Sequence, residues 1–190
     1  MTRAERAKNN FLSGYNCAQS VVLAFADDLG VPQETLLAAA LPLGGGLGRL
    51  RLTCGAVSGG AIVLGLLFPT MPKQEMYECV QEFASAFEER NKSICCGDLL
   101  RAAGLPADTV PHPEERTEEY YRRRPCPALL FDAAEILEQM CRARGRRADG
   151  SAVAEGGPPD LPLRKGDRLD LLWSKRKAKN GAGDFRAAEE

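Results

Sequence analysis

Cysteine is the residue type with the most chemical potential in this chain, because thiolates bind metals, hold iron–sulfur clusters and exchange with disulfides. The 190 residues include seven cysteines: Cys17, Cys54, Cys79, Cys95, Cys96, Cys126 and Cys141. None of them forms the C-x-x-C spacing of a thioredoxin-type pair or zinc ribbon, and no C-x-x-C-H segment for attaching haem occurs. Any cysteine site must therefore be assembled from distant segments.

Three of the cysteines are expected at the start of a helix, where free N–H groups and the positive dipole end favour a thiolate. Cys54 precedes a long apolar run and follows Arg49 and Arg51 closely. Cys126 is expected at the N-cap of the last helix, after a run of three arginines, and Cys96 opens a short helix. These surroundings predict lowered thiol pKa values.

The remaining cysteines lie in different local patterns. Cys17 is expected inside the first helix, beside its apolar face. Cys79 and Cys141 continue the apolar faces of their helices, and free cysteine is among the most buried residue types, so both are predicted to be core residues. Cys95 is a second candidate thiol next to Cys96. Spacing alone leaves open that all these thiols are merely packed.

The elements that must position the cysteines are predicted from hydrophobic periodicity, which is helical throughout. No alternating run is long enough to be a strand. We therefore expect an all-α fold, a single compact bundle of five to six helices. The expected helical ranges are 3–29, 32–41, 54–68, 73–90, 96–104 and 127–144, with one further turn at 117–123.

The chain is predicted to divide at about residue 145. Residues 1–145 form the expected four-cysteine helical domain. Residues 146–190 are rich in Gly, Pro and charged residues, a composition that cannot bury enough apolar surface to offset the entropy of ordering. We predict that this C-terminal tail is disordered.

Composition argues against several classes of protein. The formal net charge is −1, so no overall field attracts nucleic acid, and the aromatic content of 6% is too low for a base-stacking platform. The longest apolar run, 61–68, is too short to span a membrane, and the N-terminus lacks a secretory h-region. We place the protein in the cytoplasm, where structural disulfides are rare.

Two further motifs are read as structural. The segment "GGGLGR" from Gly44 to Arg49 lacks the Lys-Ser/Thr of a phosphate-binding loop, so no nucleotide is expected, and a helix break is the favoured interpretation. Gly59, Gly60 and Gly65 are predicted to let a neighbouring helix approach closely. His112, the only histidine, lies between two prolines, which argues against a Cys–His catalytic pair.

Four stretches of the sequence carry a resemblance when they are taken together. They are "FLSGYNCAQSVVLAFADDLG", "LGGGLGRLRLTCGAVSGGAIVLGL", "ERNKSICCGDLL" and "CPALLFDAAEILEQM". Over about residues 8–143 the chain resembles the family of redox-active proteins named after its cysteine pattern, C_GCAxxG_C_C. The Cys-Gly-Ala-x-x-Gly element corresponds to Cys54, Gly55, Ala56 and Gly59.

The resemblance implies which residues form the site. Cys17, Cys54, Cys96 and Cys126 would be the family's four cysteines, with Cys95 leaving the third assignment slightly ambiguous. Gly55, Ala56 and Gly59 would lie at the cofactor. Members of the family accompany oxidoreductases or transporters, and no reaction is assigned to them.

The expected function is therefore that of a redox-active protein, an electron carrier or an accessory to an oxidoreductase that serves as its partner. An iron–sulfur cluster held by the four cysteines is the leading interpretation, followed by a dithiol–disulfide pair and then a structural zinc ion. The alternative class is a non-catalytic binding or structural module, with a zinc site or merely packed thiols. Whether the protein is itself an enzyme stays open.

Overall fold

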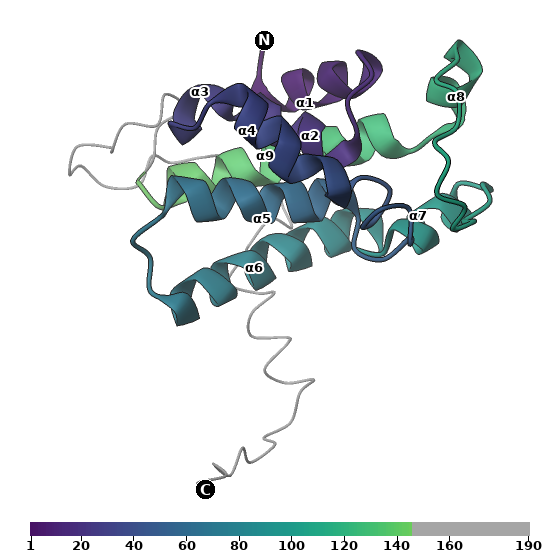
Figure 1. Cartoon of the computed structure of the whole chain (residues 1–190). Helices are drawn as coiled ribbons and strands as arrows, with labels where there is room; N and C mark the ends of the chain where they lie inside the picture. Colours follow the sequence, from purple (N-terminus) through teal and green to yellow (C-terminus); the bar gives the residue numbers. More distant parts are fainter. Residues whose placement is uncertain (146–190) are drawn as a thin grey trace, which may run out of the picture. The chain divides into compact units, whose positions relative to one another are not determined.

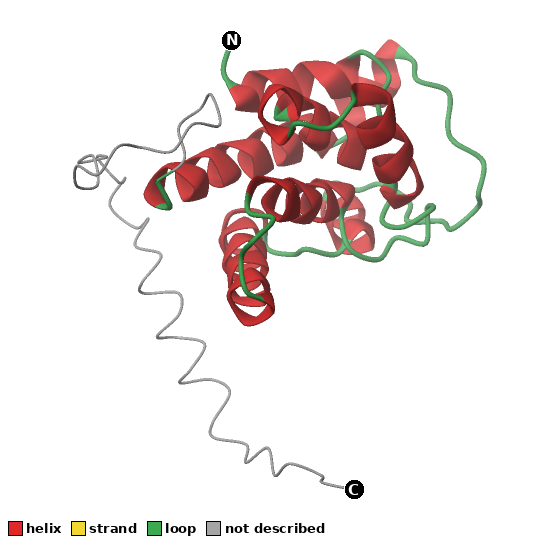
Figure 2. Ribbon diagram, turned by 60° about the vertical axis from the view of Figure 1, so that its left-hand side comes forward, coloured by secondary structure: helices red, strands yellow, loops and turns green. Residues whose placement is uncertain are grey.

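A computed structural model describes residues 1–145 of the chain. The predicted disordered tail, 146–190, lies outside the described residues, and the predicted domain boundary at its start remains a prediction. Within 1–145 the chain is helical, and the structure contains no strand there, which confirms the all-α fold (Figures 1 and 2). None of these helices has the length and apolar character needed to cross a bilayer.

The described part has more helices than the five or six expected, because the sequence breaks several of them. There are nine α-helices and one 3-10 turn between residues 1 and 145. They are α1 (Arg3–Leu12), α2 (Cys17–Ala24), α3 (Ala26–Leu29), α4 (Gln33–Ala40), η1 (Leu41–Leu43), α5 (Gly55–Leu67), α6 (Lys73–Asn91), α7 (Cys96–Ala102), α8 (Glu118–Arg123) and α9 (Cys126–Ala143).

The single helix predicted over 3–29 is wrong, and the reason is local. The chain leaves α1 at Ser13 and turns at Gly14, whose φ of 102° suits glycine. Asn16 then caps a new helix: its side chain accepts a hydrogen bond from the Gln19 N–H (3.0 Å), and the Gln19 side chain accepts one from the Asn16 N–H (3.1 Å). Cys17 is therefore the first residue of α2 and not an interior residue.

The core lies where α1, α2, α5, α6 and α9 meet. Helix α1 packs against α2 and α9, α2 packs against α5, and α5, α6 and α9 pack against one another. In Figure 1, α5 and α6 run side by side below α2 and α9. The largest fully buried side chains lie on these helices or at their ends; they include Phe11, Phe25, Phe83, Phe87, Leu64, Leu130, Leu137 and Met140.

Close packing of α5 against its neighbours depends on its glycines. A Cβ at Gly59 would lie 2.8 Å from the Ala18 carbonyl oxygen and 3.0 Å from the Ala18 Cα atom, so α2 passes directly over this position. A Cβ at Gly60 would collide with the ring of Phe83. The predicted close approach is confirmed at these two glycines. It is wrong at Gly65, which is exposed and has nothing within 4 Å.

The segment before α5 is a left-handed loop. Five successive residues, 45–49, have φ between 56° and 72°, and Arg51 has φ of 62°. Glycine adopts this conformation freely, but Leu47, Arg49 and Arg51 do so at a cost of roughly 1 kcal/mol each. The loop then pairs with the segment before α7 through an isolated antiparallel bridge between Thr53 and Cys95.

The two glycines of α5 make a matched test of this packing. We expect Gly59→Ala to lower the free energy of unfolding by about 1–3 kcal/mol, because the new methyl group meets backbone atoms that cannot rotate away. Gly65→Ala adds the same methyl group to the exposed side of the same helix, and we expect it to stabilise by about 0.5–1 kcal/mol. Urea unfolding of both variants measures the difference, and equal effects would contradict the close approach of α2.

Candidate four-cysteine centre

Each of the four cysteines marks the start of a different helix. Cys17, Cys96 and Cys126 are the first residues of α2, α7 and α9, and Cys54 immediately precedes α5. Cys126 was expected at the N-cap of α9, whereas Pro125 occupies that place. Helices α5 and α9 begin at the same end of the bundle, where α7 and the loop before α5 also lie (Figure 1).

Backbone hydrogen bonds hold Cys54 and Cys96 together. The Cys54 N–H donates to the Ile94 carbonyl and the Cys96 N–H donates to the Leu52 carbonyl, both at 2.7 Å. Gly46 makes this pairing possible, since a Cβ there would lie 2.7 Å from the Cys96 Cβ atom. Two segments separated by some forty residues are thereby fixed against each other at the site.

Cys17 is placed by the contact between α2 and α5. A Cβ at Gly55 would lie 2.8 Å from the Cys17 Cβ atom and 3.0 Å from the Ala18 nitrogen. Cys17 therefore lies directly over Gly55 in the first turn of α5, and Gly55 is the residue that follows Cys54. The glycine that follows Cys54 is what brings the two cysteines to the same place.

The four thiols interact with one another electrostatically. The Cys17 and Cys126 thiols hydrogen-bond, which raises the pKa of Cys17 well above its ordinary value, and burial and the other three cysteines raise it further. The same hydrogen bond lowers the pKa of Cys126, with help from the guanidinium of Arg124. Of the two thiols, Cys126 is therefore the more acidic and Cys17 the less acidic. The structure thus brings Cys17, Cys54, Cys96 and Cys126 together in one cluster.

Burial reverses two of the predicted pKa shifts. Cys54 is 4% exposed, and desolvation raises its pKa even though the N–H groups of Ala56 and Val57 act in the opposite direction. Desolvation also raises the pKa of Cys96, against the charge of Arg51. The predicted lowering of the thiol pKa at the helix starts is therefore wrong for Cys54 and Cys96, and it holds for Cys126.

The two arginines before Cys54 have different positions. Arg51 is buried and its guanidinium acts on Cys96. Arg49 points toward the segment between α7 and α8, where its Nε donates to the Val110 carbonyl (2.6 Å) and its Nη2 pairs with the Asp108 carboxylate (3.0 Å). The expectation that both arginines act on Cys54 is wrong, because loop geometry directs them elsewhere.

The segment between α7 and α9 is tied to the site by charge. The Asp108 carboxylate pairs with the guanidinium of Arg49, and the Asp108 carbonyl oxygen accepts a hydrogen bond from the Nε of Arg51 (2.7 Å). Glu114 pairs with Arg124, the arginine that acts on Cys126. These contacts hold the segment against the left-handed loop and place Arg51 beside Cys96 and Arg124 beside Cys126.

The other three cysteines do not belong to this cluster of four. Cys79 and Cys141 are 2% and 6% exposed, which confirms that both are core residues. Cys95 is half-buried, and its thiol donates to the Arg51 carbonyl oxygen at 3.2 Å. Of the two adjacent cysteines, Cys96 is the one that interacts with Cys17, Cys54 and Cys126.

The residues of the Cys-Gly-Ala-x-x-Gly element have different places at this site. Gly55 and Gly59 face α2 and permit its approach, while Ala56 is buried and directs its N–H toward the Cys54 sulfur. Their expected role at a cofactor stays a prediction. Gly46 was noted only as part of the segment Gly44 to Arg49, and Asp108 was not singled out from the sequence; Asp108 pairs with arginines more than fifty residues away, which leaves no local signal.

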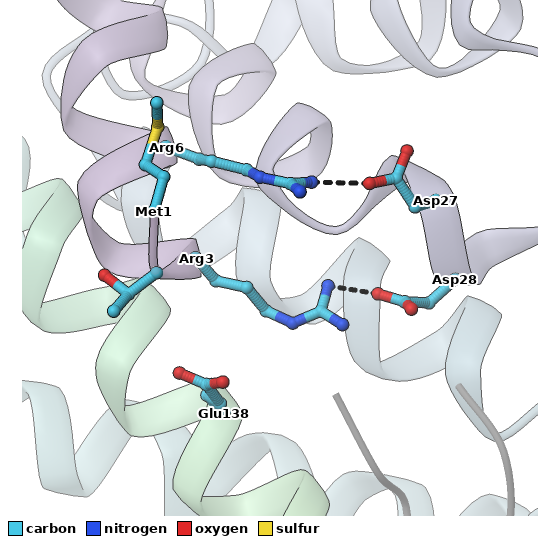
Figure 3. Close-up of a pocket in the computed structure, with 7 residues that line it drawn as sticks. Met1, Arg3, Arg6, Asp27, Asp28 and Glu138 are labelled. Carbon is cyan, nitrogen blue, oxygen red and sulfur yellow. Dashed lines mark hydrogen bonds and ion pairs between the residues drawn. The ribbon is translucent and has the colours of Figure 1, made fainter. Parts of the chain in front are cut away.

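The geometry can be compared with the needs of a single metal ion. Across residues 1–145, no three or more Cys, His, Asp or Glu side chains are placed so as to hold one ion together. A cleft of about 430 Å³ lies elsewhere, and none of the cysteines lines it (Figure 3). Its charged side chains include the ion pairs Arg3–Asp28 and Arg6–Asp27.

The fold and the site define an all-helical protein with a cluster of four buried or half-buried cysteines contributed by four separate segments. Residues 15–140 match the family C_GCAxxG_C_C, described as "Putative redox-active protein", and the chain belongs to this family. The match covers more than half of the chain and includes all four cysteines of the cluster. No curated protein and no solved structure matches the chain.

The pKa of Cys141 predicts how stability depends on pH. Burial raises this pKa from 9.0 to about 11, so the folded state keeps a proton that the unfolded chain loses. The resulting stabilisation is present below pH 9 and is lost as the pH rises from 9 to about 11. Over this window, stability should fall more steeply in the unaltered protein than in Cys141→Ser, by up to about 1.4 kcal/mol per pH unit.

Urea unfolding under reducing conditions at several pH values measures both slopes. Thiols common to the two proteins contribute equally, so only the difference between the slopes reports on Cys141. Parallel slopes would show that Cys141 ionises as readily in the folded state as in the unfolded chain.

Proposed function

We propose that the protein is an electron carrier, or an electron-transfer accessory of an oxidoreductase, and that Cys17, Cys54, Cys96 and Cys126 form its redox centre. The observation that carries this proposal is the meeting of four buried or half-buried cysteines from four helix starts in one cluster. Core packing accounts for single buried cysteines such as Cys141, but it gives no reason for four of them to meet. Membership of a redox-active family agrees with this reading.

The donor set fits an iron–sulfur cluster. Four thiolates are its usual protein ligands, and each binds a different iron atom in a four-iron cluster, so the sulfurs need not meet at one point as they must around zinc. N–H groups at the starts of α2, α5 and α9 are available to the sulfurs. Such a cluster would supply one-electron transfer. Burial of Cys54 and Cys126 would keep water away from it.

The hydrogen bond between Cys17 and Cys126 favours a second form of the same centre. A redox-active dithiol needs two cysteines in contact and a lowered pKa on the attacking thiol, and this pair has both features. Oxidation of Cys17 and Cys126 to a disulfide releases two protons and two electrons. A disulfide on the partner protein takes them up and becomes a dithiol, which balances the exchange. The cytoplasmic location belongs to this proposal, because a reducing compartment keeps the thiols available.

Anaerobic purification distinguishes the two forms. A brown protein that contains iron and acid-labile sulfide in proportion would establish the cluster. A colourless, iron-free protein that loses two thiols on treatment with oxidised glutathione, with Cys17 and Cys126 joined in the peptide map, would establish the dithiol. A colourless protein that loses fewer than two thiols would overturn the proposed function.

Two serine variants test the assignment of the cysteines. We expect Cys54→Ser to abolish iron binding, because it removes one of the four ligands from the centre. Cys141→Ser changes an equally buried cysteine in the core of α9 and should retain the iron content of the unaltered protein. Iron and sulfide analysis of the two variants measures the effect, and equal loss in both would contradict the assignment.

A further inference from the structure

Arg51 has an arrangement that is unusual for a charged residue. Its side chain is only 5% exposed, and arginines are rarely buried unless they are fully paired. The Nε donates to the Asp108 carbonyl oxygen at 2.7 Å. The Nη2 makes no hydrogen bond to any residue that the structure describes, and the Asp108 carboxylate lies 3.9 Å away from it. The buried guanidinium of Arg51 therefore has one N–H donor group, Nη2, that makes no hydrogen bond within residues 1–145.

The residues on either side of Arg51 have the opposite exposure to the one that their polarity predicts. Leu50 and Leu52 are 53% and 52% exposed, so two apolar side chains face solvent while the charged one between them is buried. Hydrophobic burial alone would favour the opposite arrangement. The left-handed φ of 62° at Arg51 adds a further cost. Something other than stability must favour an inward guanidinium here.

The group that Arg51 faces is the four-cysteine centre. The backbone carbonyl oxygen of Arg51 accepts hydrogen bonds from the Gly97 N–H (3.0 Å) and the Cys95 thiol (3.2 Å), which holds Arg51 at the start of α7. Its guanidinium lies beside the Cys96 sulfur. The guanidinium that carries the spare Nη2 donor is thus the one that acts on Cys96.

We propose that Arg51 is the counter-ion of the four-cysteine centre, and that its Nη2 group donates to the Cys96 sulfur and stabilises the reduced, more negatively charged state of the centre. This inference rests on the proposed function. Arg51 acts through the centre and is a positioning residue rather than a carrier of electrons. The reasoning applies to a cluster, which Cys96 would help to hold and which gains negative charge on reduction.

The sign of the effect follows from electrostatics. Within a buried site the interaction between a guanidinium and an added electron is poorly screened by water. The positive charge lowers the free energy of the reduced state more than that of the oxidised state. Removing it should therefore lower the midpoint potential of the centre.

The test is a redox titration of the full-length protein, purified without oxygen, as Arg51→Gln. We expect the equilibrium constant for reduction of the cluster to fall at least tenfold, which is 59 mV for its one-electron couple. The iron, sulfide and thiol contents should equal those of the unaltered protein. An unchanged potential in a variant with an intact centre would overturn the role of Arg51.

Arg49→Gln is the matched control. Arg49 has the same left-handed backbone conformation (φ of 68°) on the same loop, but its guanidinium is engaged by Asp108 and Val110. We expect its equilibrium constant for reduction to stay within threefold of the unaltered value. A shift as large as that of Arg51→Gln would show a general effect of loop charge and would overturn the specific assignment.

A second variant covers the case in which Arg51→Gln does not fold. Arg51→Lys retains the charge, but one ammonium group cannot replace both the bond to the Asp108 carbonyl and the donor to the sulfur. We expect the equilibrium constant for reduction to fall at least threefold, which is a lowered midpoint potential. An unchanged equilibrium constant would overturn the proposal. If the unaltered protein has no reversible couple, the proposed function itself fails, and that result is distinct from any comparison of variants.

Discussion

The contact between α2 and α5 is the constraint on which the position of the four-cysteine centre depends. Gly59 meets the backbone of Ala18, and Gly55 meets the Cβ atom of Cys17, so the two helices approach as closely as their backbones allow. Any side chain at either glycine would separate them. Because Cys17 and Cys54 stand at the starts of these two helices, the close approach of the helices also brings the two cysteines together. The small residues of the Cys-Gly-Ala-x-x-Gly element therefore serve the geometry of the thiols.

The other half of the centre depends on backbone pairing and charge. Cys96 is fixed by the hydrogen bond from its N–H to the Leu52 carbonyl oxygen. The left-handed loop that precedes α5 can pass close to Cys96 only because Gly46 has no side chain. The strain of that loop is offset by what holds it: the bridge to residue 95 and the contacts of its arginines with Asp108. Strain and ion pairs thus concentrate where the chain has to bring chemistry together, as expected of functional sites.

The sequence predicted the helical fold well because periodicity reports on a buried face whatever the neighbouring helix is. It failed at 3–29, where the apolar stripe continues across Gly14 and Asn16 although the backbone does not; a cap defined by Asn16 and Gln19 overrides periodicity there. The same continuity hid the position of Cys17 at a helix start. The Gly59 approach was predictable from small residues in an apolar helix, whereas Gly65 shows that this signal does not tell a packed face from an exposed one.

Thiol pKa values were the least predictable property, since they depend on neighbours distant in sequence. Local sequence shows the helix start and the arginines at Cys54, and both favour a thiolate; it does not show the burial that outweighs them. Arg51 and Arg49 look equivalent in sequence, yet the guanidinium of Arg51 lies between the Asp108 carbonyl and Cys96, whereas that of Arg49 pairs with the Asp108 carboxylate and the Val110 carbonyl. Their difference depends on contacts with residues more than fifty positions away, which the local sequence does not show.

The protonation pattern of the cluster ties its two possible forms to different cysteines. Cys17 and Arg124 lower the pKa of Cys126, while burial raises the pKa of Cys54. Disulfide chemistry would therefore begin at Cys126, the more acidic thiol of its pair. Binding a metal cluster requires all four sulfurs to be deprotonated, so protons must leave as the ligand bonds form. A buried guanidinium beside Cys96, with its Nη2 donor left unused by the residues that the structure describes, offsets the negative charge that this deprotonation leaves, which explains in physical terms why an arginine occupies an interior position between two exposed leucines.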